Sequence, residues 1–94
     1  DMDEQMAKLI LGKKLRELNA TLAAKSVSIT LTDEAHQHLL KSGYSKEYGA
    51  REMDRVIQQQ LKTMLMREIL FGKLKKGGEA TVDLQNGTLT IKQS

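Results

Sequence analysis

Apolar residues recur at spacings of three and four between residues 50 and 71, more regularly than anywhere else in this chain. The positions concerned are Met53, Val56, Ile57, Leu61, Met64, Leu65, Ile69 and Leu70. Such spacing places side chains on one face of an α-helix, where they can be buried together. We therefore predict a long helix that begins near Ala50, is ended by Gly72 and forms the main core element.

Length and composition limit the alternatives. Ninety-four residues suffice for one domain with a modest core. The absence of cysteine excludes disulfides and thiolate metal sites, which fits a cytoplasmic protein. We see no signal peptide and no apolar run of the roughly 18 residues that a membrane span needs. A net charge of +3 and an aromatic content of 3% favour neither nucleic-acid nor membrane binding.

A first helix is predicted from residue 3 to about residue 25. Its apolar stripe consists of Leu11, Leu15, Leu18 and Leu22, and it is broadened in the first half by Met6, Leu9 and Ile10. The steps of four, three and four residues are those of an amphipathic helix. We interpret it as a packing helix.

A half-buried strand is predicted at Val27–Leu31, where apolar and polar residues alternate and β-branched side chains are frequent. Thr32 is expected to cap a second helix in which Ala35 is the third residue. We expect this helix to run to about Ser42, with Gly43 as its left-handed C-cap.

The last segment is predicted to be a β-hairpin, with strands at residues 80–85 and 88–92. Asn86-Gly87 between them is the strongest two-residue hairpin signal. The expected register sets Leu84 opposite Leu89 and Val82 opposite Ile91, with Asp83 on the face turned to solvent. The fold class that follows is α+β: three helices packed on a small three-stranded sheet that ends in a C-terminal hairpin.

The stretch from Gly43 to Arg51 is a glycine-bounded loop that leads into the long helix. Arg51 and Arg55 are four residues apart, and we expect them on one helix face. Two cations at the positive end of a helix dipole suggest that an anion binds there. The alternative is that Arg51 pairs with Glu47 or Glu52 and simply holds the loop.

Catalytic signatures are missing from the sequence. It has no phosphate-binding glycine loop, no dinucleotide fingerprint and no nucleophile elbow. His36 and His38 are two residues apart, on different helix faces, so we expect surface residues and no metal site. Tyr44 and Tyr48 are interpreted as loop-packing residues, with adenine stacking as the alternative. We expect no enzymatic activity from this chain alone.

Several of these residues together resemble the small C-terminal domain of the second AAA+ module of Clp-type unfoldases. The matching run is Gly43-Tyr44, Tyr48-Gly49-Ala50-Arg51 and Arg55-Val56-Ile57-Gln58, continued by Ile69-Leu70-Phe71-Gly72 and Gly77-Gly78. The resemblance covers nearly the whole chain. Phe71-Gly72 and the double glycine favour the ClpA type, followed by the ClpB and ClpC types.

The resemblance implies that Arg51 is the sensor-2 arginine, which reaches the phosphates of ATP or ADP held by the preceding large domain. Gly49, Ala50, Tyr48 and Arg55 would support it. Magnesium would be bound by the parent protein and not by this segment. Glu52 stands where the family often has proline, and it could pair with Arg55 and draw charge away from the phosphate side.

The expected function is therefore that of a nucleotide-sensing small domain, residues 1–94, in a larger unfoldase. By the resemblance, its partners would be the large domain of the same subunit, neighbouring subunits of a hexamer, unfolded substrates and a ClpP-type peptidase. The alternative is a free-standing interaction or nucleic-acid-binding module that uses the basic cluster Lys73–Lys76. The chain starts at Asp1 without an initiator methionine, which fits a fragment.

Overall fold

A computed structural model describes residues 4–44 and 47–92 of the chain. The elements in order are α1 (Glu4–Ala23), β1 (Val27–Leu31), α2 (Asp33–Gly43), α3 (Met53–Val56), η1 (Ile57–Lys62), α4 (Thr63–Phe71), β2 (Gly78–Gln85) and β3 (Thr88–Lys92). Because α3, η1 and α4 follow one another without a break, they form one long helix, here called the third helix. The predicted α+β class, with three helices and three strands, is confirmed.

The sheet has the strand order β1-β2-β3. β2 and β3 pair antiparallel with the predicted register, in which Leu84 faces Leu89 and Val82 faces Ile91. The turn residues Asn86 and Gly87 both have positive φ, 52° and 77°, as a two-residue hairpin of this kind requires. β1 pairs parallel with β2, an arrangement that requires the long helical crossover between them.

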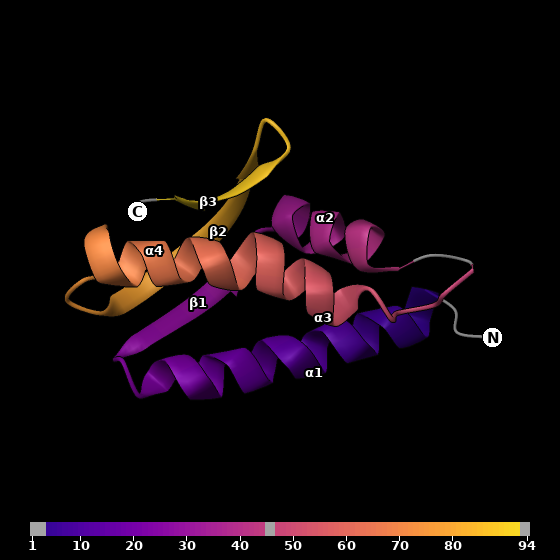
Figure 1. The fold of residues 1–94 in the computed structure, drawn as a ribbon, viewed down its shortest axis with the longest axis horizontal. Helices are drawn as coiled ribbons and strands as arrows, with labels where there is room; N and C mark the ends of the chain where they lie inside the picture. The colour runs from indigo at the N-terminus through magenta and orange to yellow at the C-terminus, as the bar shows by residue number, and fades with distance from the viewer. Residues whose placement is uncertain (1–3, 45–46, 93–94) are drawn as a thin grey trace.

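The helices cover one face of this sheet, and α1 and the third helix run side by side from the same end of the molecule (Figure 1). Alternate strand residues point into the core that they enclose. The buried residues from the strands are Val27, Ile29, Ala80, Val82, Leu89 and Ile91. Leu11, Leu39, Met53, Leu61 and Leu65 from the helices are among the most deeply buried side chains.

The third helix differs from the prediction at its start and in its middle. It begins at Met53, three residues after Ala50, because Arg51 and Glu52 lie in a turn. Residues Ile57–Lys62 are π-helical, so that the N–H of Thr63 donates to the carbonyl of Gln58, five residues back. The Thr63 hydroxyl donates to the same carbonyl at 3.0 Å. A π-helical segment inserts one residue into the helix and shifts the faces on either side of it.

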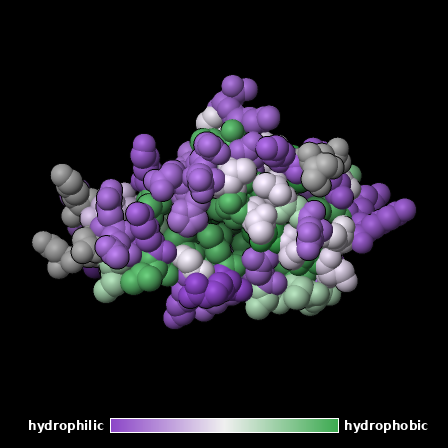
Figure 2. Space-filling view, turned by 180° about the vertical axis from the view of Figure 1, so that it is seen from behind, coloured by the Kyte–Doolittle hydropathy of each residue, from purple (hydrophilic) through white to green (hydrophobic). Residues whose placement is uncertain are grey.

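Three side chains that the apolar pattern predicted to face inward are exposed. Met6, Leu9 and Leu70 have 50%, 66% and 56% of their surface accessible. In the view from behind, apolar side chains appear in the middle of the face and at its lower left edge, near the N-terminal half of α1 (Figure 2). Helical periodicity identifies an apolar face, but this small sheet is not large enough to cover all of it.

Gly43 is not the left-handed C-cap that the sequence suggested. It is the last residue of α2 and is buried, and its φ lies outside the left-handed region. A Cβ at this position would lie 2.5 Å from Met53 Sδ and 3.0 Å from Met53 Cα. Glycine is therefore present because the end of α2 and the start of the third helix approach so closely.

The free edge of β1 is paired by a side chain. Asn19 of α1 accepts a hydrogen bond from the Ile29 N–H at 2.8 Å and donates to the Ile29 carbonyl at 3.0 Å. An edge strand with unpaired backbone groups invites pairing with another chain. Asn19 satisfies this edge at its centre and also fixes α1 to the sheet.

The start of α2 is joined to β2 through Thr32. Its hydroxyl accepts from the Ala35 N–H, which confirms the predicted cap, and donates to Asp83 Oδ1 at 2.9 Å. Asp83 also accepts from the N–H of Leu84 at 2.8 Å, and this bond, followed by that from Thr32, lowers the pKa of the Asp83 carboxyl. Asp83 was predicted to face solvent; it is instead partly buried and forms part of this junction.

Candidate functional site

The loop before the third helix is anchored at both ends. Tyr44 and Ala50 pack against the core, and Met53 is fully buried. The N–H of Met53 donates to the Ala50 carbonyl at 3.0 Å, and the N–H of Arg51 donates to the Tyr48 carbonyl at 3.3 Å. These bonds form a tight turn and hold Arg51 just outside the first helical residue.

Gly49 contributes the conformation that this turn requires. Its φ is 63°, in the left-handed region that other residues seldom adopt. Ser45 and Lys46 of the predicted loop lie outside the described residues, as does residue 3, where the first helix was predicted to begin.

The Arg51 side chain is exposed and, among residues 4–44 and 47–92, has no ion-pair or hydrogen-bond partner. The alternative in which Arg51 pairs with Glu52 is not observed. Glu52 Oε2 instead lies 3.2 Å from Arg55 Nη1, the i,i+3 pair that the sequence suggested. Arg51 is thus a guanidinium at the surface, on a backbone turn that is fixed by its neighbours.

Arg51 and Arg55 do not share a helix face, contrary to the prediction. The helix begins at Met53, so Arg51 lies before it while Arg55 lies within it. Of the two tyrosines, Tyr44 is partly buried against the core, as loop packing requires, whereas Tyr48 is 56% exposed. Of the residues predicted to support Arg51, Gly49 and Ala50 shape its turn, and Arg55 pairs with Glu52.

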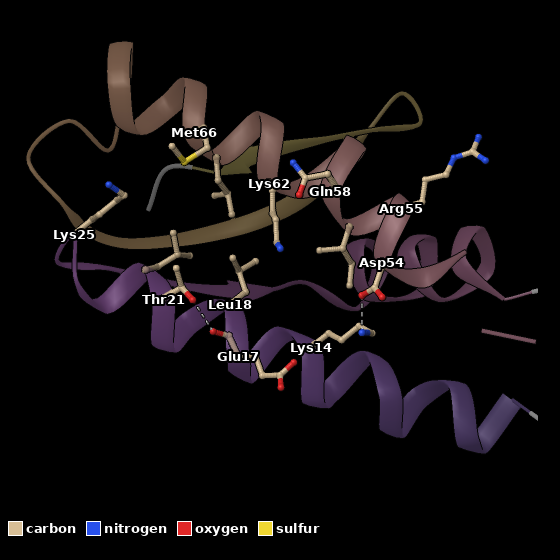
Figure 3. A pocket seen from close by; sticks show the side chains of 13 residues that line it. Lys14, Glu17, Leu18, Thr21, Lys25, Asp54, Arg55, Gln58, Lys62 and Met66 are labelled. Carbon is tan, nitrogen blue, oxygen red and sulfur yellow. Dashed lines mark hydrogen bonds and ion pairs between the residues drawn. The ribbon is translucent and has the colours of Figure 1, made fainter. Parts of the chain in front are cut away.

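A groove that the sequence did not reveal lies between α1 and the third helix (Figure 3). Its volume is about 580 Å³. An ion pair between Lys14 of α1 and Asp54 of α3 spans it at the end near Arg51. No local pattern marks this groove, because each wall comes from a different helix.

The two histidines of α2 are less exposed than the sequence suggested. His36 and His38 are partly buried, and His38 Nε2 lies 2.6 Å from Gln60 Oε1 of the third helix. Within the described part of the chain, no group of three or more histidine, aspartate or glutamate side chains could hold a metal ion. The helices described are also too short or too polar to cross a membrane.

Comparison with known proteins places this fold and loop in a family. Residues 2–82 match the profile of the C-terminal, D2-small domain of ClpB protein. The chain is 33% identical over 82 residues to the chaperone protein ClpB of Bacillus cereus, covering 87% of the chain and 10% of that protein. It is 39% identical over 82 residues to a ClpA homolog protein of Fuscovulum blasticum, with the same coverage.

A third relative is the ATP-dependent Clp protease ATP-binding subunit ClpA homolog of Pyropia yezoensis, 35% identical over 78 residues, or 82% of the chain and 10% of that protein. The chain spans about a tenth of the length of these relatives. Relatives of both ClpA and ClpB type match, so the resemblance to a Clp small domain is confirmed. The chain belongs to the family of C-terminal D2-small domains of Clp-type AAA+ chaperones.

Proposed function

We propose that this domain senses the nucleotide bound to a Clp-type ATPase and that Arg51 is its sensor-2 residue. The observation that carries the proposal is the exposed Arg51 guanidinium, without an ion-pair partner among the described residues, on a turn held by Gly49, Ala50 and Met53. A rigid backbone with a free cation at its surface is suited to bind phosphate from another domain. Guanidinium-to-phosphate hydrogen bonds are charge-assisted and directional.

The neighbouring charges support this assignment. Because the Glu52 carboxylate pairs with Arg55, it does not neutralise Arg51. The carboxylate of Asp54, the second residue of the third helix, is likewise paired with another cation, Lys14. The pairing of Glu52 with Arg55 is the one that the sequence suggested, and it draws Arg55, but not Arg51, away from a phosphate contact.

The exposed apolar residues of α1 suggest how the domain is attached to its parent. Met6 and Leu9 lie in the first two turns of α1, and the Lys14–Asp54 ion pair joins the middle of α1 to the start of the third helix, next to the Arg51 turn. A large domain packed there would cover the Met6 and Leu9 side chains and bring its bound nucleotide close to Arg51. Loss of the γ-phosphate would remove charge from this contact and allow the small domain to rotate.

In this proposal the parent is a cytoplasmic hexamer that binds ATP with magnesium, unfolds proteins and, if it is of the ClpA type, passes them to a peptidase. The name of the Pyropia relative includes both ATP binding and a Clp protease. The 94-residue chain alone would hydrolyse no ATP, because it has no phosphate loop.

The test is made in the full-length parent with Arg51→Ala and Arg51→Lys. A charge-assisted hydrogen bond contributes about 1.5–3 kcal/mol, so we expect ATP turnover to fall roughly 10- to 100-fold in Arg51→Ala. Arg51→Lys should recover only part of it, since lysine lacks the planar fork. Arg67 is an exposed arginine within the third helix; Arg67→Ala is the matched control and should change turnover less than about twofold.

Hexamer formation and folding are measured on the same samples by sedimentation and circular dichroism. Unchanged turnover in correctly assembled Arg51→Ala would refute the sensor role. The turn would then serve only to connect α2 with the third helix. A loss of turnover that is matched by Arg67→Ala would show a general effect of surface charge instead.

A further inference from the structure

The groove between α1 and the third helix has an apolar floor. Leu18 and Leu22 of α1 and Ile57 and Leu65 of the third helix line it. These four side chains are nearly buried, while Met66 at the rim is 41% exposed. The groove is therefore a shallow channel with an apolar floor, and its exposed apolar side chain is Met66, a flexible residue type that adapts to varied partners.

Charge is distributed unequally along the groove. At the end near Arg51, Lys14 pairs with Asp54, and Arg55 is already paired with Glu52. Lys25 lies at the other end, and Lys62 points into the middle of the groove, near Leu18 (Figure 3). Within residues 4–44 and 47–92 neither ammonium has an ion-pair partner.

Lys62 and Lys25 make the channel cationic from its middle to the end away from Arg51. Glu17 is the remaining acidic residue of the lining, against these two lysines. A ligand that fills the channel would bury its apolar face on the floor and meet positive charge along this half. The complementary ligand is apolar on one side and acidic.

The length of the channel fits a helix. Its lining on the third helix extends from Asp54 to Met66, which at 1.5 Å per residue corresponds to roughly 18 Å, or about three helical turns. Leu70, one turn beyond Met66 on the same face, extends the apolar surface past the groove and is 56% exposed. An amphipathic helix laid along two helices is a common mode of peptide recognition.

The π-helical segment lies on this wall. Ile57, Gln58 and Lys62, three residues of η1, line the groove. π-helical insertions are costly and are frequently found at functional sites. Here the insertion changes which residues of the third helix face the groove, and it is part of the same surface as Lys62.

We propose that this groove binds an acidic amphipathic helix of another protein, with its carboxylates at Lys25 and Lys62. The longest helix of a second copy, α1, does not match this description, because its charged residues are mainly basic. The charged residues of α1 are Lys8, Lys13, Lys14 and Arg16, against Glu4 and Glu17. The site is separate from that of the proposed function, because Lys62 is nine residues, or roughly 14 Å of helix, beyond Met53, where the third helix begins after the Arg51 turn.

The probe is a fluorescein-labelled synthetic peptide of about three to four turns, with leucines at i, i+3, i+4 and i+7 and glutamates on the flanking positions. Its affinity for the 94-residue chain is measured by fluorescence anisotropy. Lys62→Glu should weaken binding at least about tenfold, since it reverses the charge over the floor. Arg67→Glu makes the same change of net charge on another face of the third helix and should weaken binding less than about twofold.

A scrambled peptide of equal charge, and the same peptide with glutamine in place of glutamate, are the ligand controls. Both should bind at least about tenfold more weakly than the probe, because one lacks the apolar face and the other lacks the charge. Equal losses in Lys62→Glu and Arg67→Glu would overturn the proposal, because attraction by net charge alone would explain them. The proposal would also be overturned if excess unlabelled peptide failed to displace the labelled probe.

Two other occupants of the groove are tested by direct measurement. Dodecanoate binding that Lys62→Glu abolishes, without peptide binding, would assign the groove to a small anionic amphiphile and refute a protein partner. Self-association in sedimentation that Lys62→Glu abolishes would assign it to a second copy. Circular dichroism of each variant confirms that the exposed substitutions leave the fold intact. Arg51→Ala should leave peptide affinity unchanged, which separates this site from the nucleotide-sensing turn.

Discussion

Replacement of Gly43 by alanine tests the close approach on which the position of the Arg51 turn depends. The new Cβ would lie 2.5 Å from Met53 Sδ and 3.0 Å from Met53 Cα. Met53 is fully buried, so its side chain has little room to move, and its Cα can move only with the start of the third helix. Overpacking of this kind costs about 1–3 kcal/mol.

The helix propensity of alanine acts in the opposite direction. Alanine is favoured over glycine within a helix by about 0.5–1 kcal/mol. We therefore expect Gly43→Ala to lower the free energy of unfolding by about 1–2 kcal/mol. In a domain of this size, each kcal/mol corresponds to a decrease of about 4–8 °C in melting temperature.

Gly12→Ala is the matched control, because Gly12 is also a helical glycine. A Cβ there meets only Arg16 Nη1 at 3.4 Å, the end of a flexible side chain. We expect this variant to gain about 0.5–1 kcal/mol from helix propensity. The two variants should therefore shift the urea unfolding midpoint in opposite directions.

A double-mutant cycle with Met53→Ala identifies the cause. Met53→Ala alone should cost about 2–5 kcal/mol as a cavity, and Gly43→Ala should cost much less in that background because Sδ is gone. If Gly43→Ala is as stable as Gly12→Ala, or if its cost is unchanged without the Met53 side chain, the steric explanation is wrong.

Two further predictions concern junctions that join elements distant in sequence. Asn19→Ala would leave the Ile29 N–H and carbonyl without their partner, and we expect a loss of about 2 kcal/mol in urea unfolding; an unchanged midpoint would show that water replaces the amide. The pKa of the Asp83 carboxyl is lower in the folded state than its unfolded value of 3.8, so the ionised carboxylate stabilises the fold at pH values above 3.8. This contribution is lost as the pH falls through the lower pKa of the folded state. Asp83→Asn should therefore show a shallower loss of stability than the parent chain between about pH 5 and pH 2, and parallel curves would contradict this.

Local signals in the sequence determined the elements and one of the two strand pairings. Asn86-Gly87 favours a turn with positive φ at both residues, and this turn fixed the hairpin register without reference to the rest of the chain. Thr32 was predicted as a cap from its position alone, and Val27–Leu31 from its alternation. The run from Tyr48 to Arg51 indicated the family, which the comparisons confirmed.

Features that depend on distant segments were missed or were predicted wrongly. The sequence gives no sign that β1 pairs parallel with β2, because parallel strands are joined by a crossover and not by a turn. The π-helical segment interrupts an apolar pattern that reads as an ordinary α-helix. Leu74 lies within the basic cluster Lys73–Lys76, yet it is buried.

The candidate sites divide in the same way. The identity of Arg51 came from a local motif, but its exposure depends on the pairing of Glu52 with Arg55 and on the start of the helix at Met53. Gly43 was read as a cap because local sequence cannot reveal that Met53 packs against it. The groove has walls from two helices that are separated in sequence by residues 24–52. Backbone propensities act over a few residues and can be read from the sequence, whereas close approaches, grooves and free charges arise only when distant segments pack together.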